Sequence, residues 1–475
     1  MKIAVIMGGI RFDSQKRILN GIIEKAKEDQ TDIYVFCCDV WSYSTTQFIT
    51  GEIEIYKLPD FTNYDGVIIH GDTLYNAETI ANIFQNVHDA EVPCVNLTLK
   101  VEGMPTLSME NDNGITLLIN HLVEKHGAKT INFISGPQGN SDGEGRLKAY
   151  KKALKEHGIE VEEHRIYFGD YHPKSGMEAV EFFADCGLDM PDAIMAANDE
   201  MALGALYELE KRGYRIPEDI MITGYDNIYE AQNHAPRITS VQRPEEELGR
   251  KAYTYLMDEI AGKPKIGNEQ LLSWPVFAES CGCKCDTKED FAELRRKLAQ
   301  DRVEITTFTE IIKASSADFV GVGTQKDLFE KIRKYVAMLD PEEFYLCLGY
   351  NTNSINTDIM SQLNTEAANV DLLTYPKDAT VPIAYRNGHF ETYGRFHVNE
   401  LLPEKYKEHD GGRLYTIVPV HYQERTYGYC VLGKSRLLID SSWFHLFIMN
   451  INNALESVRK QEVMNAMVER LNRMW

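Results

Sequence analysis

The sequence predicts an α/β protein, with doubly wound parallel sheets in its first part and a smaller α+β domain after it. From Lys2 to about Gly224, short runs rich in Val and Ile alternate with segments whose apolar residues recur at helical spacing. Runs that are apolar at nearly every position suit strands buried on both faces, as in a parallel sheet. After Cys285 this alternation stops, and long polar helices flank a group of strand-like runs, which is typical of a separate α+β domain.

The elements of the first part can be placed in order along the chain. Strands are expected at 3–7, 33–38, 66–70, 94–97, 130–135, 193–197 and 220–223, and helices around 18–26, 115–122 and 202–209. Ligands of open parallel sheets lie beyond the carboxyl ends of the strands, so the residues that follow each strand are the candidates for function. These residues are polar and glycine-rich, but Asn, Asp, Ser and Gly also serve turns and helix caps.

Composition and charge exclude several classes of protein. The chain has 475 residues, with 50 Lys and Arg against 72 Asp and Glu, and a formal charge of -22. Such a surface repels phosphate backbones, so no nucleic-acid partner is expected. No run reaches the roughly 18 apolar residues that cross a bilayer, and the first residues do not form a signal peptide. A cytoplasmic location without membrane contact is therefore expected, with the 9 Cys present as thiols.

Enzyme motifs are missing from the sequence. The segment after the first strand, Gly8-Gly9-Ile10-Arg11, is not the Gly-x-Gly-x-x-Gly of dinucleotide-binding proteins. Walker-type, Gly-x-Ser-x-Gly and His-Glu-x-x-His motifs are also absent. The sequence therefore predicts a protein that is not an enzyme and has no cofactor.

Three segments together resemble a known family. They are Gly136-Pro137 with Gly145-Arg146-Leu147-Lys148-Ala149-Tyr150, then Ala196-Ala197-Asn198-Asp199-Glu200-Met201-Ala202-Leu203-Gly204-Ala205, then Gly224-Tyr225-Asp226-Asn227 with Val241-Gln242-Arg243-Pro244. In this order they resemble the effector-binding core of lactose-repressor-type regulators, over residues 1–283. The resemblance implies the bilobed type 1 periplasmic-binding-protein fold, with a small ligand between the lobes.

The resemblance also implies a set of ligand-binding residues. A guanidinium can bind vicinal hydroxyls or a carboxylate, an Asn can donate and accept, and an Asp accepts from hydroxyls or amines. The expected contacts are Arg146, Asn198, Asp226, an aromatic at Tyr171, and Arg11, Phe12 and Asp13 from the first lobe. Arg243 stands where many members have Gln; it favours an anionic ligand, or it forms a salt bridge to a neighbouring Glu. Asp199 is expected to cap the following helix instead of binding ligand.

Two features near the ends of this region complete the interpretation. Met1 starts almost on the first strand, so the DNA-binding head that the family usually carries is expected to be absent. Cys281-Gly282-Cys283-Lys284-Cys285 could suggest a metal, but structural zinc sites normally use Cys-x-x-Cys spacing and a second pair of ligands. Since no second pair is evident in the sequence, no metal is expected.

The second part resembles a GAF-type sensor domain in its order of elements. Long helices are expected over 288–314 and 328–339, strands at 344–348, 381–385, 414–422 and 427–432, and a final helix from 441. This assigns residues 284–440 to the GAF-like domain and 441–475 to a signalling helix. Ile448, Ile451, Leu455 and Val458 follow heptad spacing, as do Met464, Met467, Leu471 and Met474. The helix either pairs with a partner helix or lies on its own sheet.

These features lead to one main functional hypothesis and two alternatives. The main hypothesis is a cytoplasmic sensor that closes on a small polar ligand, such as a sugar, a nucleobase or a small carboxylate. It would form a parallel homodimer through its C-terminal helices and pass the change to an output domain, a diguanylate cyclase of the GGDEF type, whose linker the last residues resemble. The alternatives are a lactose-repressor-type transcriptional regulator without its head, and an enzyme on an α/β scaffold.

Overall fold

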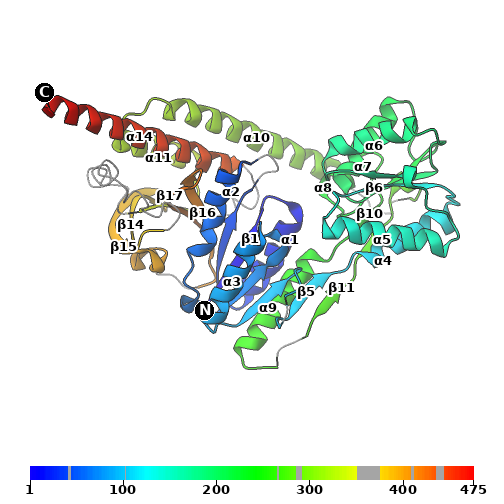
Figure 1. The fold of residues 1–475 in the computed structure, drawn as a ribbon, viewed down its shortest axis with the longest axis horizontal. Coiled ribbons are helices and arrows are strands. Elements are labelled where there is room, and N and C mark those ends of the chain that lie inside the picture. The colour runs from blue at the N-terminus through cyan, green and yellow to red at the C-terminus, as the bar shows by residue number, and fades with distance from the viewer. Residues whose placement is uncertain are drawn as a thin grey trace. The chain divides into compact units, whose positions relative to one another are not determined.

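The computed structural model describes residues 1–40, 44–101, 103–264, 267–284, 291–349, 375–407, 411–434 and 443–474 (Figure 1). The chain forms two compact units, and each is described by itself. Unit 1 comprises Met1–Thr106, Gly249–Gly267 and Asp290–Trp475, and unit 2 comprises Leu107–Leu248 and Asn268–Glu289. In this division the C-terminal part packs into the same unit as the first strands. The boundaries at residues 283 and 440 stay a prediction.

The N-terminal part of unit 1 is a parallel sheet with helices between its strands. Strand β1 pairs in parallel with both β2 and β3, and β3 pairs with β4. All residues of β2 and β3 are buried, as expected for strands covered on both faces. The elements are β1 (Lys2–Gly8), α1 (Asp13–Glu28), β2 (Asp32–Cys38), α2 (Thr46–Ile53), β3 (Gly66–His70), α3 (Ala77–Asp89), β4 (Cys94–Leu97) and α9 (Glu245–Ile260).

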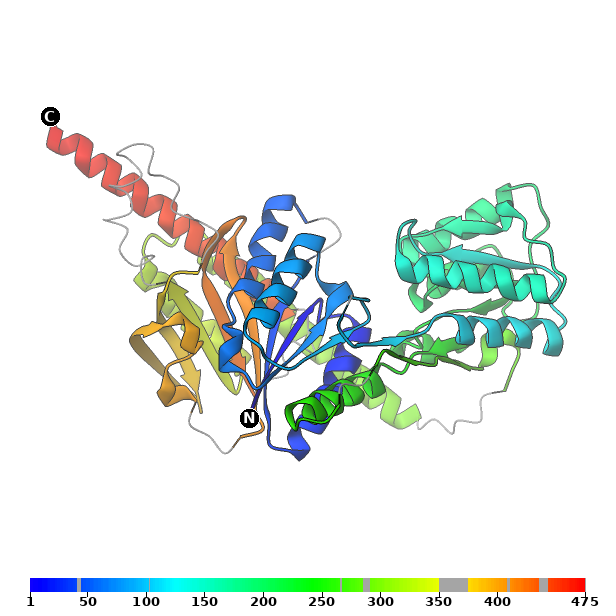
Figure 2. The same cartoon turned by 60° about the horizontal axis from the view of Figure 1, so that its bottom comes forward.

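The C-terminal part of unit 1 is an antiparallel sheet with helices packed on it. Its strands pair in the order β16-β17-β13-β14-β15. Helix α14 packs against α10, α11 and β16, and its outer end extends past the sheet (Figure 2). The elements are α10 (Phe291–Phe319), α11 (Gln325–Leu339), β13 (Glu343–Gly349), β14 (Asp378–Arg386), β15 (His389–His397), β16 (Leu414–Tyr422), β17 (Arg425–Gly433) and α14 (Trp443–Met474).

The two sheets of unit 1 are joined edge to edge. Strand β16 pairs in parallel with β2, with Leu414 opposite Ile33 and Ile417 opposite Phe36. The Tyr34 and Tyr415 rings stack beside this seam with centroids 4.9 Å apart. The strand order within unit 1 is therefore β4-β3-β1-β2-β16-β17-β13-β14-β15. The order of helices and strands agrees with the α+β prediction, whereas the GAF-type assignment stays a prediction.

The C-terminal helix divides into a buried and an exposed segment. Ile448, Ile451, Leu455 and Val458 are at most 3% exposed, because this half of α14 packs on its own unit. The stripe that the sequence assigned to a partner helix is therefore core over this first segment. Further along, Met464 and Leu471 are 55% and 57% exposed. Among the described residues, no helix has an apolar stretch long enough to span a membrane.

Unit 2 is built around a second parallel sheet, in the order β7-β6-β8-β9. Its core contains fully buried side chains of the sheet and of helices α4 to α7, such as Phe133, Leu118, Ala149 and Leu206. The elements are β5 (Thr106–Met109), α4 (Asp112–Asn120), a π-helical turn (His121–Lys125), β6 (Ile131–Ser135), α5 (Ser141–Glu156), β7 (Ile166–Phe168), α6 (Pro173–Asp185), β8 (Ala193–Ala196), α7 (Asp199–Lys211), β9 (Met221–Thr223), α8 (Tyr229–Gln232), β10 (Ser240–Gln242), β11 (Glu269–Leu271), β12 (Trp274–Val276) and a 3-10 turn (Glu279–Cys281).

Candidate functional site

Arg146 lies at the centre of a polar cluster in unit 2. It sits on α5, is 3% exposed, and its Nη1 donates to the carbonyl of Ala197 at 2.5 Å. Its guanidinium carbon lies 3.8 Å from the centroid of the Tyr225 ring, a cation–π arrangement. The backbone carbonyl and the ring hold the guanidinium in place, so that its Nε donates to Asn111 Oδ1 at 3.5 Å and its Nη2 faces two acids.

Two carboxylates and a second guanidinium surround Arg146. Its Nη2 lies 3.5 Å from Oδ2 of Asp142 and 3.6 Å from Oδ1 of Asp226. Arg243 approaches the same two carboxylates at 3.7 and 3.9 Å. Burial alone would lower the pKa of Arg146, but Asp226, Tyr225 and Asp142 together raise it. The pKa of Arg243 is also raised, since Asp142, Tyr225 and Asp226 outweigh its burial.

The backbone at this cluster is held in an uncommon conformation. Asp226 has φ +98° and the next residue, Asn227, has φ +50°. Residues other than Gly rarely adopt this region, and such strain collects at ligand-binding sites. Asn227 is fixed there by its backbone N–H, which donates to Ser240 Oγ at 3.0 Å, and by its side-chain amide, which donates to Gln242 at 2.7 Å.

Tyr171 and Asn198 lie next to each other, and the side chain of Asn198 bonds to backbone groups nearby. The Asn198 side chain accepts from the Met201 backbone N–H at 3.0 Å and so caps helix α7. Its amide donates to the Tyr171 carbonyl at 2.9 Å. The Tyr171 ring lies against Gly136, where a Cβ atom would come within 2.3 Å of the ring, so only glycine leaves room for it. Burial raises the pKa of Tyr171 to about 12, so its hydroxyl is protonated.

Asp199 does not cap helix α7, contrary to the prediction. It is fully buried, and its carboxylate accepts from Ser240 Oγ at 2.6 Å and from the Ile228 backbone N–H at 2.8 Å. Burial raises the pKa of this carboxyl well above its usual range. Ile228 lies two residues after Asp226, and Ser240 Oγ also accepts from the Asn227 backbone N–H, so Asp199 acts as a support for that turn.

The other three predicted ligand residues, Arg11, Phe12 and Asp13, belong to unit 1. The Arg11 guanidinium pairs with Asp39 and donates to the Val40 carbonyl at 3.3 Å. It also lies 4.3 Å from the centroid of the Phe12 ring, and that ring is 48% exposed. Asp13 begins α1 and lies 3.6 Å from Lys16. Arg11 is therefore engaged within its own unit, while Phe12 remains accessible.

The ion pair of Arg11 continues into a buried network. Glu52 accepts from the Asp39 backbone N–H at 2.7 Å and lies 3.0 Å from His421 Nε2 on β16. His445, in the first turn of α14, lies 3.8 Å from both Asp39 and Glu52. The network links the loop after β1 to the C-terminal strands and helix. No sequence pattern indicated this network, since its members are up to several hundred residues apart.

The buried network leads to a prediction about pH. Burial lowers the pKa of His445 below its usual 6.5, and Arg11 and His421 add to this effect, while Glu52 opposes it. Below about pH 6.5 the unfolded chain therefore binds a proton that the folded chain does not, so the free energy of unfolding falls as the pH falls. We expect the His445→Gln variant to lose less stability than the wild-type chain between about pH 7 and about pH 5.

Urea unfolding at the two pH values measures this difference. His88→Gln is the matched control, because His88 is an exposed histidine on α3 of the same unit. Equal loss of stability in His445→Gln and His88→Gln between the two pH values would show that the buried histidine does not contribute to the pH dependence of the free energy of unfolding.

Sequence reasoning located part of the unit 2 cluster and missed the rest. The structure brings Arg146, Asp226 and Arg243 together, and Tyr171 beside Asn198. It adds Asp142 and Tyr225, which were not predicted. Asp142 lies one helical turn before Arg146, and Tyr225 precedes Asp226 in sequence, so helical spacing from Arg146 could have pointed to the first. The position of these residues as ligand contacts stays a prediction.

Comparisons with known proteins place the similarity in the part of the chain that carries this cluster. Residues 119–281 match the family described as a periplasmic binding protein-like domain. The HTH-type transcriptional repressor PurR of Proteus mirabilis is 38% identical over 143 residues, 30% of this chain and 41% of that protein. PurR of Photorhabdus laumondii is 36% identical over 143 residues, with the same shares of the two chains. This chain thus matches about two fifths of the length of these curated relatives.

A solved structure supports the fold. A dimeric Lac repressor with an 11-residue C-terminal deletion aligns with a TM-score of 0.50 and 21% identity, over 59% of this chain and 98% of that one. At this identity the likeness concerns the fold alone. Residues 119–281 are thus similar to a periplasmic binding protein-like domain, and the α/β fold with parallel sheets agrees with the fold of the Lac repressor.

Proposed function

We propose that this chain is a regulatory protein that binds a small polar ligand at the cluster of Arg146, Asp142, Asp226 and Arg243. The observation that carries the proposal is the spacing of this cluster. The guanidinium–carboxylate contacts are 3.5 to 3.9 Å, longer than the roughly 2.7–2.9 Å of a charge-assisted hydrogen bond. A hydroxyl placed between a guanidinium and a carboxylate can accept from the first and donate to the second, so that two short hydrogen bonds replace one long ionic contact.

The charges of the cluster favour an uncharged ligand over an anion. Arg243 was expected either to favour an anionic ligand or to form a salt bridge to a neighbouring Glu. Asp142 and Asp226 face it, and Glu245 Oε1 lies 4.0 Å from its Nε. Two guanidinium groups are thus balanced by carboxylates before any ligand binds, and a ligand carboxylate would meet acidic neighbours. Within the classes expected from the sequence, a sugar or a nucleobase therefore fits better than a small carboxylate.

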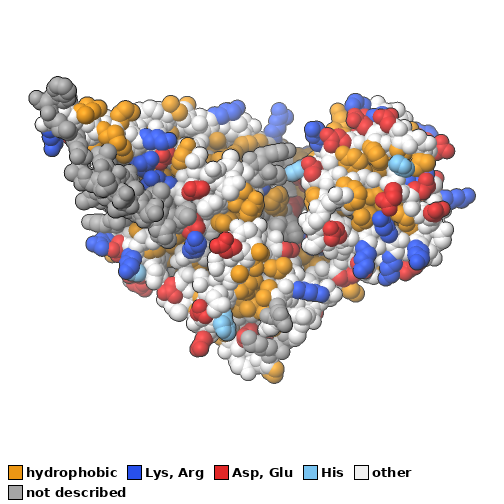
Figure 3. Space-filling view, viewed as in Figure 1, with side chains coloured by type: hydrophobic (Ala, Val, Ile, Leu, Met, Phe, Trp, Pro, Cys, Tyr) orange, Lys and Arg blue, Asp and Glu red, His pale blue; other side chains and the backbone are white. Residues whose placement is uncertain are grey.

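The relatives favour one of the two regulatory hypotheses. PurR is a transcriptional repressor, which supports the alternative of a lactose-repressor-type regulator over a sensor for a diguanylate cyclase. We propose no nucleic-acid contact for the described residues. On the face drawn in Figure 3, Lys and Arg side chains are scattered among Asp and Glu side chains, and the chain has a net charge of -22.

Unit 1 offers a route for transmitting a signal and a surface for dimerisation. The network of Arg11, Asp39, Glu52, His421 and His445 offers a route from the loop after β1 to α14, since a shift of Arg11 changes the charges around His445. Helix α14 also presents an exposed apolar stripe at Met464, Met467, Val468 and Leu471. In a two-fold dimer the same stripe of each chain would face its copy, so dimerisation is proposed through this outer segment alone.

Binding can be tested with a library of sugars, nucleobases and nucleosides. We expect at least one compound to raise the thermal midpoint of the chain, and the Asp226→Asn variant to bind it about 10- to 100-fold more weakly, the loss for one hydrogen bond to a charged group. Asn tolerates a positive φ, so the turn is kept.

Asp185→Asn, at the exposed end of α6, is the matched control and should bind like the wild-type chain. If no compound stabilises the chain, or if Asp226→Asn binds as tightly as Asp185→Asn, the cluster is not the ligand site.

A further inference from the structure

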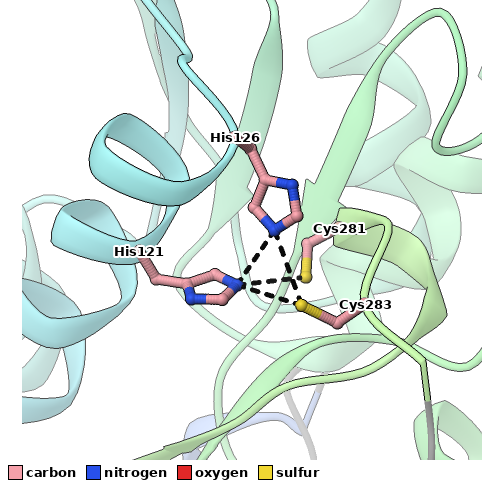
Figure 4. A group of neighbouring side chains, drawn as sticks. All are labelled: His121, His126, Cys281 and Cys283. Atoms are coloured by element: carbon pink, nitrogen blue, oxygen red, sulfur yellow. Dashed lines mark hydrogen bonds between the residues drawn. The ribbon is translucent and has the colours of Figure 1, made fainter.

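Four side chains with metal-binding atoms converge at one point of unit 2. His121 and His126 come from the end of helix α4, and Cys281 and Cys283 come from a segment about 160 residues further along (Figure 4). Their ring nitrogens and sulfurs all lie within 4.8 Å of one another. The two histidines are the second pair of ligands that the sequence did not reveal next to the Cys-Gly-Cys segment.

The distances fit a tetrahedral zinc site. His121 Nε2 lies 3.0 Å from His126 Nε2, 3.3 Å from Cys283 Sγ and 3.7 Å from Cys281 Sγ. His126 Nε2 lies 3.5 Å from Cys283 Sγ. Zinc bonds of about 2.0–2.1 Å to nitrogen and about 2.3 Å to sulfur, at tetrahedral angles, place the ligand atoms about 3.3–3.8 Å apart. Of the six pairs that four ligand atoms form, these four include three within that range and one, between the two histidines, that needs a shift of a few tenths of an ångström. The other two pairs, His126 with Cys281 and Cys281 with Cys283, lie within 4.8 Å.

The backbone is shaped to bring the two histidines to the same side. In an α-helix, residues five apart point in different directions, because each residue turns about 100°. Here α4 changes to a π-helical turn over His121–Lys125, whose wider turn and i→i+5 bonding bring His121 and His126 together. Such turns are rare and occur mostly at functional sites. This feature is independent of the cysteines.

The backbone of the cysteine segment also directs its side chains toward the site. Gly282 has φ +89°, a conformation that glycine adopts without strain, and it reverses the chain so that both sulfurs face the histidines. The His121 ring is held by Phe277, which stacks on it with ring centroids 3.7 Å apart. Both pairs are therefore oriented by structure outside the four ligands.

Hydrogen bonding alone explains this arrangement poorly. An imidazole Nε2 has one proton or one lone pair and makes one good hydrogen bond, whereas three other groups surround Nε2 of His121 within 3.7 Å. A disulfide between Cys281 and Cys283 is not formed in the structure. A central cation satisfies all four ligand atoms at once, after the two thiols release their protons to solvent.

We propose that His121, His126, Cys281 and Cys283 bind one Zn²⁺ ion. Two imidazoles and two thiolates are a ligand set typical of structural zinc, and four protein ligands leave no open position for a substrate. The ion would join the end of α4 to the turn Glu279–Cys281 and the residues that follow it, and so fasten the last part of unit 2 to its first helix. The proposal is independent of the ligand-binding function proposed above.

The test uses the full chain and Zn²⁺ itself. After treatment with a chelator under reducing conditions, the chain should take up one equivalent of Zn²⁺ and gain thermal stability. Co²⁺ in place of Zn²⁺ should give the intense visible absorption of a tetrahedral site together with sulfur-to-cobalt charge transfer. This spectrum reports ligand type and geometry even where stability does not change.

Variants identify the ligands. Cys283→Ser and His126→Gln, both at half-buried positions, should lower zinc affinity at least about 100-fold, as loss of a direct ligand exceeds the loss of an outer-shell partner. Cys186→Ser, a cysteine at the end of α6, should bind zinc like the wild-type chain. Circular dichroism of the metal-free variants shows whether they fold. The proposal is wrong if the wild-type chain binds no stoichiometric zinc, if folded Cys283→Ser binds it normally, or if the cobalt spectrum lacks tetrahedral and thiolate bands.

Discussion

Replacing Leu455 by Asp is expected to unfold unit 1, whereas replacing Leu471 by Asp on the same helix is expected to leave its stability nearly unchanged. Leu455 is 3% exposed and Leu471 is 57% exposed. Removing a buried leucine costs about 2–5 kcal/mol, and a carboxylate in its place adds the cost of a buried charge without a partner. The sum reaches the total stability of many domains, roughly 5–15 kcal/mol. Urea unfolding followed by circular dichroism measures both variants.

The same pair of variants separates folding from assembly. If the outer stripe of α14 forms the proposed dimer, Leu471→Asp should be a folded monomer by light scattering at concentrations where the wild-type chain is dimeric. A wild-type chain that is monomeric under these conditions would contradict the dimer. Equal stability of Leu455→Asp and Leu471→Asp would contradict the packing of α14 on its own unit.

The ambiguity of α14 shows a limit of sequence patterns. Spacing of three and four residues between apolar positions is the same whether a helix packs on its own sheet or on a partner helix. Ile448 and Leu455 turned out to be core, while Leu471 is exposed, yet both segments have the same spacing. Only the position of β16 and α10 beside the first segment distinguishes them, and that position depends on contacts far apart in sequence.

The strands show which elements a sequence can predict. Continuous apolar runs such as those of β2 and β3 were predicted within a residue of their ends, because burial on both faces favours apolar residues at nearly every position. The prediction missed β5, β7 and β10 to β12, which are three or four residues long. It also missed β15, which is nine residues long but exposed at most positions, so it lacks an apolar run. The pairing of β2 with β16 was also missed, because register between strands nearly 400 residues apart leaves no local pattern.

The functional residues also divide into those that the sequence predicts and those that it does not. Arg146, Asp226 and Arg243 follow from segments whose residue order resembles a known family, and the structure brings the three together. His121 and His126 were not predicted, because histidines five apart do not share a face of an α-helix, and nothing in the sequence indicates the π-helical turn. Their partners, Cys281 and Cys283, were noticed but lacked a second pair of ligands within the same stretch of chain.

Replacing Arg146 by Met is expected to destabilise unit 2 as well as to weaken ligand binding. Met keeps the unbranched apolar stem of the side chain but removes the guanidinium and its charge. The Ala197 carbonyl then loses its donor, and the Tyr225 ring loses its cation. Arg243 is left as the shared counter-charge of Asp142 and Asp226. Breaking a buried ion pair from one side costs about 3–5 kcal/mol, and we expect about 3 kcal/mol because both acids are partly exposed.

Lys148→Met is the matched control for this prediction, since Lys148 lies on the same helix and is exposed. Loss of a surface lysine should change the free energy of unfolding by less than about 0.5 kcal/mol. Hydrogen exchange of α5, β8 and the turn at Asp226 should increase in Arg146→Met and remain unchanged in Lys148→Met. The reason is that Arg146, and not Lys148, contacts the Ala197 carbonyl and the Tyr225 ring. If both variants exchange and unfold alike, Arg146 does not hold the cluster together, and its burial among Asp142, Asp226 and Tyr225 has no energetic consequence.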